Sequence, residues 1–178
     1  ELFSIEQYVE MALQFSRLSA KSTDFVIGEV SLDKVVREAI HKYARLFVRK
    51  KIKMELSSID TQVLTDEKWL EFVIEQILSN AIKYTAGGTI SVYLKEEPEQ
   101  ETKELVIEDT GIGIAPEDLP RIFEKGYTGY NGHADKRSTG IGLYLCRKIM
   151  RKLSHEITIE SEIGVGTKVH LEMRSRDK

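Results

Sequence analysis

Cysteine, proline and tryptophan are scarce in this chain, whose 178 residues include one, three and one of them. The single cysteine, Cys146, excludes a disulfide framework and a zinc site with four thiolate ligands, and it is typical of a reducing, cytosolic compartment. Cys146 lies in the apolar run 142–146, with no histidine close to it in the sequence. We therefore expect a small buried hydrophobic residue here rather than a nucleophile.

An excess of either charge is lacking as well. The 26 Lys and Arg residues nearly balance the 29 Asp and Glu residues, and no basic block stands out. Nucleic acid is therefore not an expected partner. No stretch approaches the roughly 20 apolar residues that a membrane-spanning helix needs. The composition, 41% hydrophobic and 31% charged, is that of a globular protein, and the length allows one α/β domain with one additional element.

Residues 1–24 carry the pattern of an amphipathic helix. Apolar side chains recur at helical spacing, at Leu2, Ile5, Val9 and Ala12. A helix this apolar needs a partner, which is either the domain that follows or another helix of a bundle. Because the chain begins inside this pattern, we interpret it as part of a longer protein.

The rest of the chain alternates helices with pairs of strands. Helices are expected at 31–49, 65–84 and 141–153, where apolar residues recur at helical spacing. Strands are expected at 25–30, 52–56, 63–64, 90–94, 105–107, 157–159 and 168–171. Most of the strand pairs are hairpins. We therefore predict an α/β fold, a two-layer sandwich with helices on one face of a mixed, mostly antiparallel sheet, preceded by the first helix.

Three polar residues share one side of the helix expected at 65–84. At 100° per residue, Gln76, Asn80 and Lys83 form one stripe beside the apolar face, and Tyr84 bridges the two. A carboxamide oxygen one turn from an ammonium group suits Mg²⁺ bound to phosphate, because the cation takes the oxygen and the amine meets the phosphate. The polar flank of an ordinary half-buried helix would show the same pattern.

Three glycine-containing segments would allow a nucleotide to approach the backbone closely. Segment 109–113, Asp-Thr-Gly-Ile-Gly, follows a strand; its carboxylate can accept a hydrogen bond from an adenine amino group, and its glycines admit a flat base. Segment 138–143 begins a helix, where free backbone N–H groups bind anions. Segment 164–167, Gly-Val-Gly-Thr, lies between the last two strands. Taken alone, each is equally compatible with a tight turn, a flexible loop or a hairpin turn.

The order of these segments is more specific than any one of them. The chain has an Asn-Ala-x-Lys-Tyr helix at 80–84, Asp-x-Gly-x-Gly at 109–113, a Phe-Glu loop at 122–126, a Gly-x-Gly helix start at 140–143 and Gly-x-Gly-Thr at 164–167. This set resembles the ATP-binding domain of sensor histidine kinases, in the superfamily that includes gyrase, Hsp90-type chaperones and mismatch-repair ATPases. The resemblance covers roughly residues 25–173 and implies the Bergerat ATP-binding fold.

The resemblance implies ATP and Mg²⁺ as cofactors and a role for each matching position. Asn80 would bind Mg²⁺ with Gln76 as a second ligand, and Asp109 would recognise the adenine amino group, supported by Thr167 through a water. Residues 125–139 would form a mobile lid. The other nucleotide-binding residues would be Lys83, Tyr84, Gly111, Gly113, Gly140, Ile141, Gly142 and Leu143.

Two departures from the family pattern matter. Family members usually carry a second asparagine where this chain has Gln76, and ATP-hydrolysing relatives place a glutamate there to activate water. Glu75 is the neighbour and points about 100° away around the helix, which favours phosphate transfer over hydrolysis. The second departure is that none of the four histidines lies in the context of a phosphoacceptor: His41, His133, His155 and His170.

The resemblance assigns 1–24 to the second helix of a truncated dimerisation hairpin and 25–178 to the catalytic domain. It implies transfer of the ATP γ-phosphate to a histidine of the dimerisation domain, then relay to a response regulator, within a homodimer. Segment 126–132 is similar to that of short intramembrane-sensing kinases of Gram-positive bacteria, which work beside peptide-exporting ABC transporters. This implies a cytoplasmic domain of a membrane-anchored bacterial protein. Two alternatives stay open: an ATP-driven clamp with ATPase activity, and a non-catalytic nucleotide-binding or dimerisation module.

Overall fold

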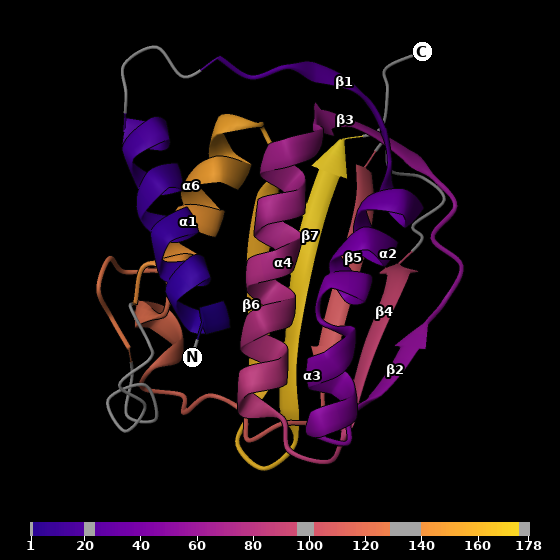
Figure 1. The fold of residues 1–178 in the computed structure, drawn as a ribbon, viewed down its shortest axis with the longest axis vertical. Helices are drawn as coiled ribbons and strands as arrows, with labels where there is room; N and C mark the ends of the chain where they lie inside the picture. Colours follow the sequence, from indigo (N-terminus) through magenta and orange to yellow (C-terminus); the bar gives the residue numbers. More distant parts are fainter. Residues whose placement is uncertain (1, 20–23, 96–101, 129–139, 175–178) are drawn as a thin grey trace.

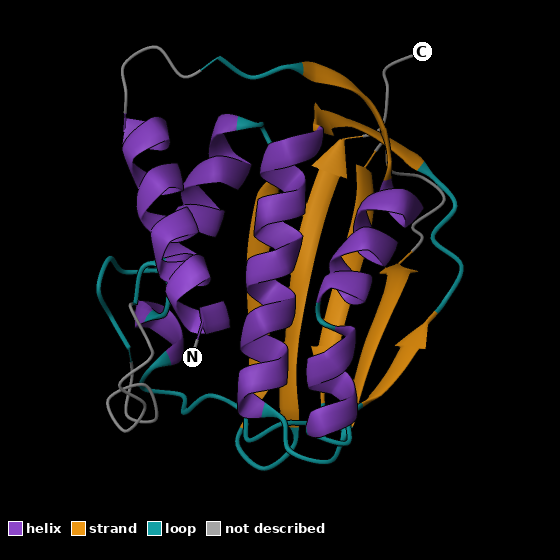
Figure 2. Ribbon diagram, viewed as in Figure 1, coloured by secondary structure: helices purple, strands orange, loops and turns teal. Residues whose placement is uncertain are grey.

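The molecule has two layers, with helices covering one face of a β-sheet (Figure 1, Figure 2). The structure is a computed structural model that describes residues 2–19, 24–95, 102–128 and 140–174. Its arrangement confirms the predicted two-layer α/β sandwich.

Within the described residues, the main sheet has five strands, and one of its neighbouring pairs is parallel. They are β2 (Lys53–Leu56), β4 (Thr89–Lys95), β5 (Thr102–Asp109), β6 (Glu156–Glu162) and β7 (Gly166–Arg174), in the spatial order β2-β4-β5-β7-β6. Strands β2 and β4 are parallel and the other neighbours are antiparallel. A separate two-stranded sheet pairs β1 (Ile27–Ser31) with β3 (Gln62–Asp66). The prediction of a mixed, mostly antiparallel sheet is confirmed.

The described helices are α1 (Leu2–Ser19), α2 (Leu32–Lys42), α3 (Ala44–Arg49), α4 (Glu67–Tyr84) and α6 (Gly142–Lys152), with a short 3₁₀ turn, η1 (Leu119–Arg121). Two of them, α2 and α4, begin at side-chain caps. The Ser31 hydroxyl accepts from the Lys34 N–H at 3.3 Å, and Asp66 Oδ1 accepts from the Trp69 N–H at 3.1 Å. Asp66 is thus the N-cap of α4.

The helix expected at 31–49 is divided into α2 and α3. The break lies at Tyr43, whose backbone leaves the helical conformation with φ −100° and ψ 9°. The Tyr43 ring is buried, with 1% of its surface exposed. Apolar spacing alone did not distinguish a continuous helix from two helices that share a buried aromatic residue.

Helix α4 lies in the middle of the helical layer, with α2 on one side and α6 on the other (Figure 1). Its apolar face packs on the sheet through residues such as Leu70, Ile74 and Leu78, all buried. Cys146 of α6 is also fully buried, and burial raises the pKa of its thiol. The expectation that Cys146 is a small buried residue is confirmed.

Helix α1 packs beside α6 through only part of its apolar surface. Leu18 is buried, and Met11 and Phe15 pack against the core, whereas Val9 and Leu13 are 55% and 53% exposed. The side chain of Lys152 in α6 donates a hydrogen bond to the Leu18 carbonyl at 3.0 Å, which fixes the end of α1. Val9 and Ala12 of the predicted apolar face are thus exposed, as the alternative of packing on another helix of a bundle allows, and the side chains of Leu2 and Ile5 lie outside the described part. Among the described helices, none combines the length and the apolar character that crossing a membrane requires.

Candidate nucleotide-binding site

Four residues form a row across one end of the sheet, on the face that the helices cover. The strand register places Asp109 of β5 between Ile90 of β4 and Thr167 of β7, and it places Ser161 of β6 next to Thr167. Alternate residues of a strand share a face, and Ile90 is fully buried in the core. The row therefore puts a carboxylate and two hydroxyl groups at the edge of an otherwise apolar surface.

Asp109 is a buried carboxylate held by backbone donors. Only 9% of its surface is exposed, and the Gly111 N–H donates to its Oδ1 at 2.9 Å. Burial raises the pKa of the Asp109 carboxyl, while hydrogen bonds from the Gly111 and Thr167 N–H groups act in the opposite direction. A carboxylate has about four lone-pair positions, so Asp109 keeps acceptor capacity for a donor on a ligand.

The segment after Asp109 lies against the C-terminal end of α4. The Ile112 N–H donates to the Tyr84 carbonyl at 3.1 Å. A side chain at Gly111 would collide with that carbonyl and would lie 2.8 Å from Thr85 Oγ1. The Thr85 hydroxyl is buried and has no hydrogen-bond partner within the described part of the chain. Close packing against α4 therefore requires glycine at Gly111. The unsatisfied Thr85 hydroxyl beside the Asp109 carboxylate fits a small polar ligand.

The same segment is held on its other side by the turn between β6 and β7. The Gly164 N–H donates to the Ile112 carbonyl at 2.9 Å. Gly113 has φ +76°, and a side chain there would collide with the Glu162 backbone. Glycine is therefore required at Gly113 for both conformation and space. The two sequence segments 109–113 and 164–167 form one contiguous structure.

The polar stripe of α4 joins this structure to the start of α6. Gln76 is 8% exposed, and a side chain at Gly142 would lie 3.1 Å from its Oε1. Asn80 and Lys83 lie in the turns of α4 between Gln76 and Tyr84 and are partly exposed. The Lys83 Nζ lies 5.2 Å from the centre of the Tyr84 ring. The predicted stripe thus runs along α4 from one glycine segment to the other.

The ends of the expected lid meet each other. The Gly126 N–H donates to the Gly140 carbonyl at 2.9 Å, and Gly140 has φ +67°. Ile141 precedes α6, whose start has no side-chain cap, and Leu143 in its first turn is partly exposed. Uncapped N–H groups at a helix start suit an anion. The lid residues 129–139, with His133, lie outside the described residues.

Glu75 is turned away from the polar stripe, as its position on the helix predicts. Its carboxylate forms an ion pair with Lys42 of α2 at 2.9 Å, and only 7% of its side chain is exposed. Glu75 therefore faces α2, whereas Gln76 faces α6. Among the described residues, no group of three or more His, Cys, Asp or Glu side chains could hold a metal, so a cation beside α4 would depend on the carboxamide oxygens of Gln76 and Asn80.

Three residues of the site escaped sequence reasoning. Thr85 and Ser161 join it only through contacts between distant segments, and no local motif signals them. Arg147 of α6 lies with its guanidinium 4.9 Å from the centre of the Phe123 ring, which links the Phe-Glu loop to α6. Of this last pair, the sequence motif indicated only Phe123, the aromatic residue of the loop, and not Arg147.

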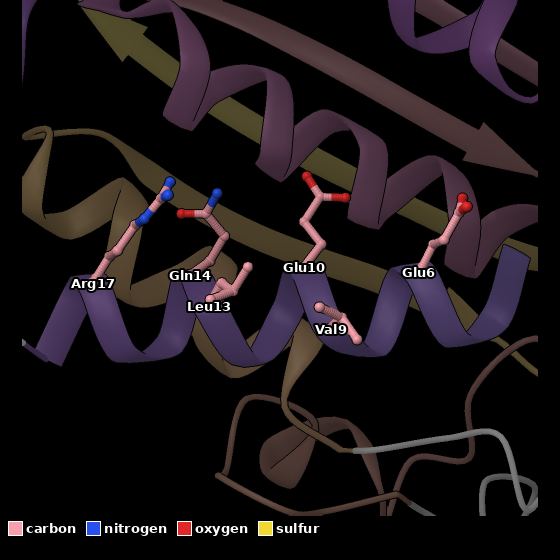
Figure 3. Close-up of a pocket in the computed structure, with 6 residues that line it drawn as sticks. All are labelled: Glu6, Val9, Glu10, Leu13, Gln14 and Arg17. Carbon is pink, nitrogen blue, oxygen red and sulfur yellow. The ribbon is translucent and has the colours of Figure 1, made fainter.

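A groove of about 420 Å³ lies on α1, apart from these residues (Figure 3). Its six lining residues all belong to α1: Glu6, Val9, Glu10, Leu13, Gln14 and Arg17. No residue of the polar stripe or of the glycine segments contributes to it. It is therefore a feature of the exposed side of α1 and not of the nucleotide site.

Residues 65–177 match the family described as histidine kinase-, DNA gyrase B-, and HSP90-like ATPase. The chain belongs to this ATPase family. It is 38% identical over 170 residues to the sensor histidine kinase YxdK of Bacillus subtilis (strain 168), covering 95% of this chain and 52% of YxdK. It is 35% identical over 167 residues to the sensor protein BceS of the same strain, covering 94% and 49%. The chain thus spans about half the length of these relatives.

Solved structures of histidine kinases share the fold of this ATPase family member. The mycobacterial sensor histidine kinase MprB superposes with a TM-score of 0.72 at 24% identity, over 86% of this chain and all of that chain (100%). Full-length ShkA in complex with AMPPNP superposes with a TM-score of 0.78 at 22% identity, over 96% of this chain and 36% of that chain. The predicted histidine kinase catalytic fold is confirmed.

Proposed function

We propose that this chain is the ATP-binding catalytic part of a sensor histidine kinase. In this proposal, residues 25–178 bind ATP and transfer its γ-phosphate to a histidine on a dimerisation hairpin. The main structural support is the buried Asp109 carboxylate, which two backbone N–H groups orient beneath the end of a helix that carries Asn80 and Lys83. The identity to proteins named sensor kinases over nearly the whole chain supports it further.

The base would bind at the sheet end of the site. The Asp109 carboxylate would accept a hydrogen bond from the adenine amino group, beside a loop whose Gly111 and Gly113 allow it to pack closely against the end of α4 and the β6–β7 turn. The unsatisfied Thr85 hydroxyl lies at the same place. Thr167, hydrogen-bonded to Asp109 through its N–H, would complete this end.

The phosphates would lie along α4 towards α6. Lys83 would contact phosphate oxygens, and Asn80 with Gln76 would hold Mg²⁺ through their carboxamide oxygens, since this hard cation takes oxygen ligands. Bound Mg²⁺ would neutralise the charge of the phosphates. The first N–H groups of α6, after Gly140 and Ile141, would receive a phosphate oxygen.

Phosphate transfer is favoured over hydrolysis because, on the described polar stripe of α4, the position where ATP-hydrolysing relatives carry a water-activating glutamate holds Gln76. Gln76 stands one turn before Asn80 and cannot take a proton from water. The adjacent carboxylate, Glu75, is buried against α2 in its ion pair with Lys42. An ATP-driven clamp is therefore the weaker reading.

Helix α1 would be the second helix of the dimerisation hairpin. Two of its apolar residues, Val9 and Leu13, are about half exposed, as a face that awaits another helix would be. In the full-length protein we propose a homodimer, anchored in a bacterial membrane with this part in the cytoplasm. The partners would be a response regulator and, from the similarity of segment 126–132 to transporter-associated kinases, an ABC transporter.

The deciding experiment supplies a phosphoacceptor in trans. The chain is mixed with γ-labelled Mg-ATP and a separately produced dimerisation hairpin from YxdK, with a hairpin lacking its acceptor histidine as control. We expect label on the intact hairpin only. Release of free phosphate without labelled hairpin would identify a clamp ATPase, and nucleotide binding with neither product would identify a non-catalytic module.

A further inference from the structure

Ser161 of β6 is the centre of a hydrogen-bond network beside Asp109. Its hydroxyl oxygen accepts from the Ile114 N–H at 2.8 Å and lies 3.0 Å from the Gly166 carbonyl, to which it donates. The Thr167 hydroxyl lies 2.8 Å from the same oxygen. One serine thus contacts the loop after Asp109, the turn before β7 and the side chain of Thr167.

Proton counting fixes the direction of the bond between the two hydroxyl groups. A hydroxyl group has a single proton to donate, and a backbone carbonyl can only accept. Because the Ser161 proton is directed to the Gly166 carbonyl, the Thr167 hydroxyl must donate its own proton to Ser161. The Thr167 oxygen is then left with lone pairs alone.

Thr167 and Asp109 therefore form a wall of acceptors. The two residues are directly opposite in the β5–β7 register, and the Thr167 N–H bonds the Asp109 carboxylate. Both lie on the face that α4 covers. A ligand that meets this wall must present donors to it, because an acceptor would stand opposite lone pairs.

We propose that Ser161 is a positioning residue for base selection, acting through Thr167. By taking the Thr167 proton, it keeps the wall free of donors, so that a purine with an amino group at C6 is bound and one with a carbonyl group there is rejected. This inference rests on the proposed binding of ATP. Without Ser161, the Thr167 hydroxyl can rotate and donate to a C6 carbonyl oxygen.

The test compares ATP with inosine triphosphate, which carries a carbonyl group at C6. Dissociation constants of both Mg-nucleotides are measured by calorimetry on the 178-residue chain. We expect Ser161→Ala to reduce the preference for ATP by about five- to tenfold, the size of one hydrogen bond of about 1 kcal/mol. Thr158→Ala is the matched control, since Thr158 is an exposed hydroxyl residue of the same strand, and it should leave the preference unchanged.

A double mutant shows whether Ser161 acts through Thr167. In a Thr167→Val background, Ser161→Ala should have no further effect on the ratio of the two constants. If Ser161→Ala weakens both nucleotides equally and leaves their ratio unchanged, Ser161 only holds the loop and the inference is overturned, while ATP binding stands. If the unmodified chain does not bind ATP, the proposed function fails as well. Should Ser161→Ala not fold, Ser161→Cys accepts hydrogen bonds only weakly and serves in its place.

Discussion

At the scale of single residues, Asp109 is the side chain proposed to recognise the base. Its carboxylate is buried and oriented by two N–H groups, so its loss cannot be compensated by a mobile neighbour. We predict that Asp109→Ala abolishes the preference for adenine over guanine nucleotides, a change of at least about tenfold in the ratio of affinities. Glu108→Ala is the control, because Glu108 bonds Tyr93 and Lys168 instead. An equal loss of affinity for both bases would contradict the assigned role.

Asn80 gives a second prediction at this scale. If its carboxamide oxygen is a ligand of Mg²⁺, Asn80→Ala should weaken Mg-ATP by tenfold or more, since a lost interaction with a charged group is worth roughly 1.5–3 kcal/mol. ATP without Mg²⁺ should bind the variant and the unmodified chain equally. Calorimetry with and without EDTA separates the two cases. Unchanged affinity for Mg-ATP would remove Asn80 from the metal site.

At the scale of elements, the sequence predicted what local periodicity determines. The helix at 65–84 and the hairpin strands at its end are strongly patterned, and α4, β4 and β5 follow them closely. The break at Tyr43 and the docking face of α1 depend on which partner buries each side chain, and spacing does not contain that information. Leu18, the last apolar residue of α1, is buried against the domain, whereas Val9 and Leu13 of the regular pattern before it are about half exposed.

Helix α1 therefore provides a prediction with an internal control. Leu18 is 1% exposed and Leu13 is 53% exposed, although both are leucines of the same helix. Leu18→Ala should weaken the attachment of α1 by about 2–4 kcal/mol, through lost burial and the cavity left behind, and Leu13→Ala should change little. Hydrogen exchange of the α1 amides measures both. Equal protection in the two variants would show that Leu18 does not hold the helix.

At the scale of the whole molecule, the site is a product of the strand order. The hairpin partners β4–β5 and β6–β7 are neighbours in the sequence and were predictable from alternation and turns. The pairing of β5 with β7 joins the two hairpins and brings Asp109 beside Thr167 and Ser161. No local pattern indicates this pairing. Only the family resemblance placed Thr167 near Asp109, and Ser161 and Thr85 were not predicted to belong to the site.

The stability of the whole fold should depend on His155 at mildly acidic pH. The ring is 5% exposed, its Nε2 lies 3.0 Å from Thr65 Oγ1, and burial, with a smaller effect of Arg174, lowers its pKa from 6.5 to about 4. As the pH falls below 6.5, His155 binds a proton in the unfolded chain but stays neutral in the folded chain. The contribution of neutral His155 is therefore complete above pH 6.5 and is lost progressively down to about pH 4, by up to about 3 kcal/mol.

Denaturant unfolding at a series of pH values measures this loss. His155→Gln does not titrate, so its free energy of unfolding should fall less between pH 7.5 and 5 than that of the unmodified chain, because only the latter gains a proton on unfolding. His41→Gln is the matched substitution control, since His41 is an exposed residue of α2. Parallel pH profiles for His155→Gln and the unmodified chain would mean that His155 is protonated within the fold, which its burial against Thr65 opposes.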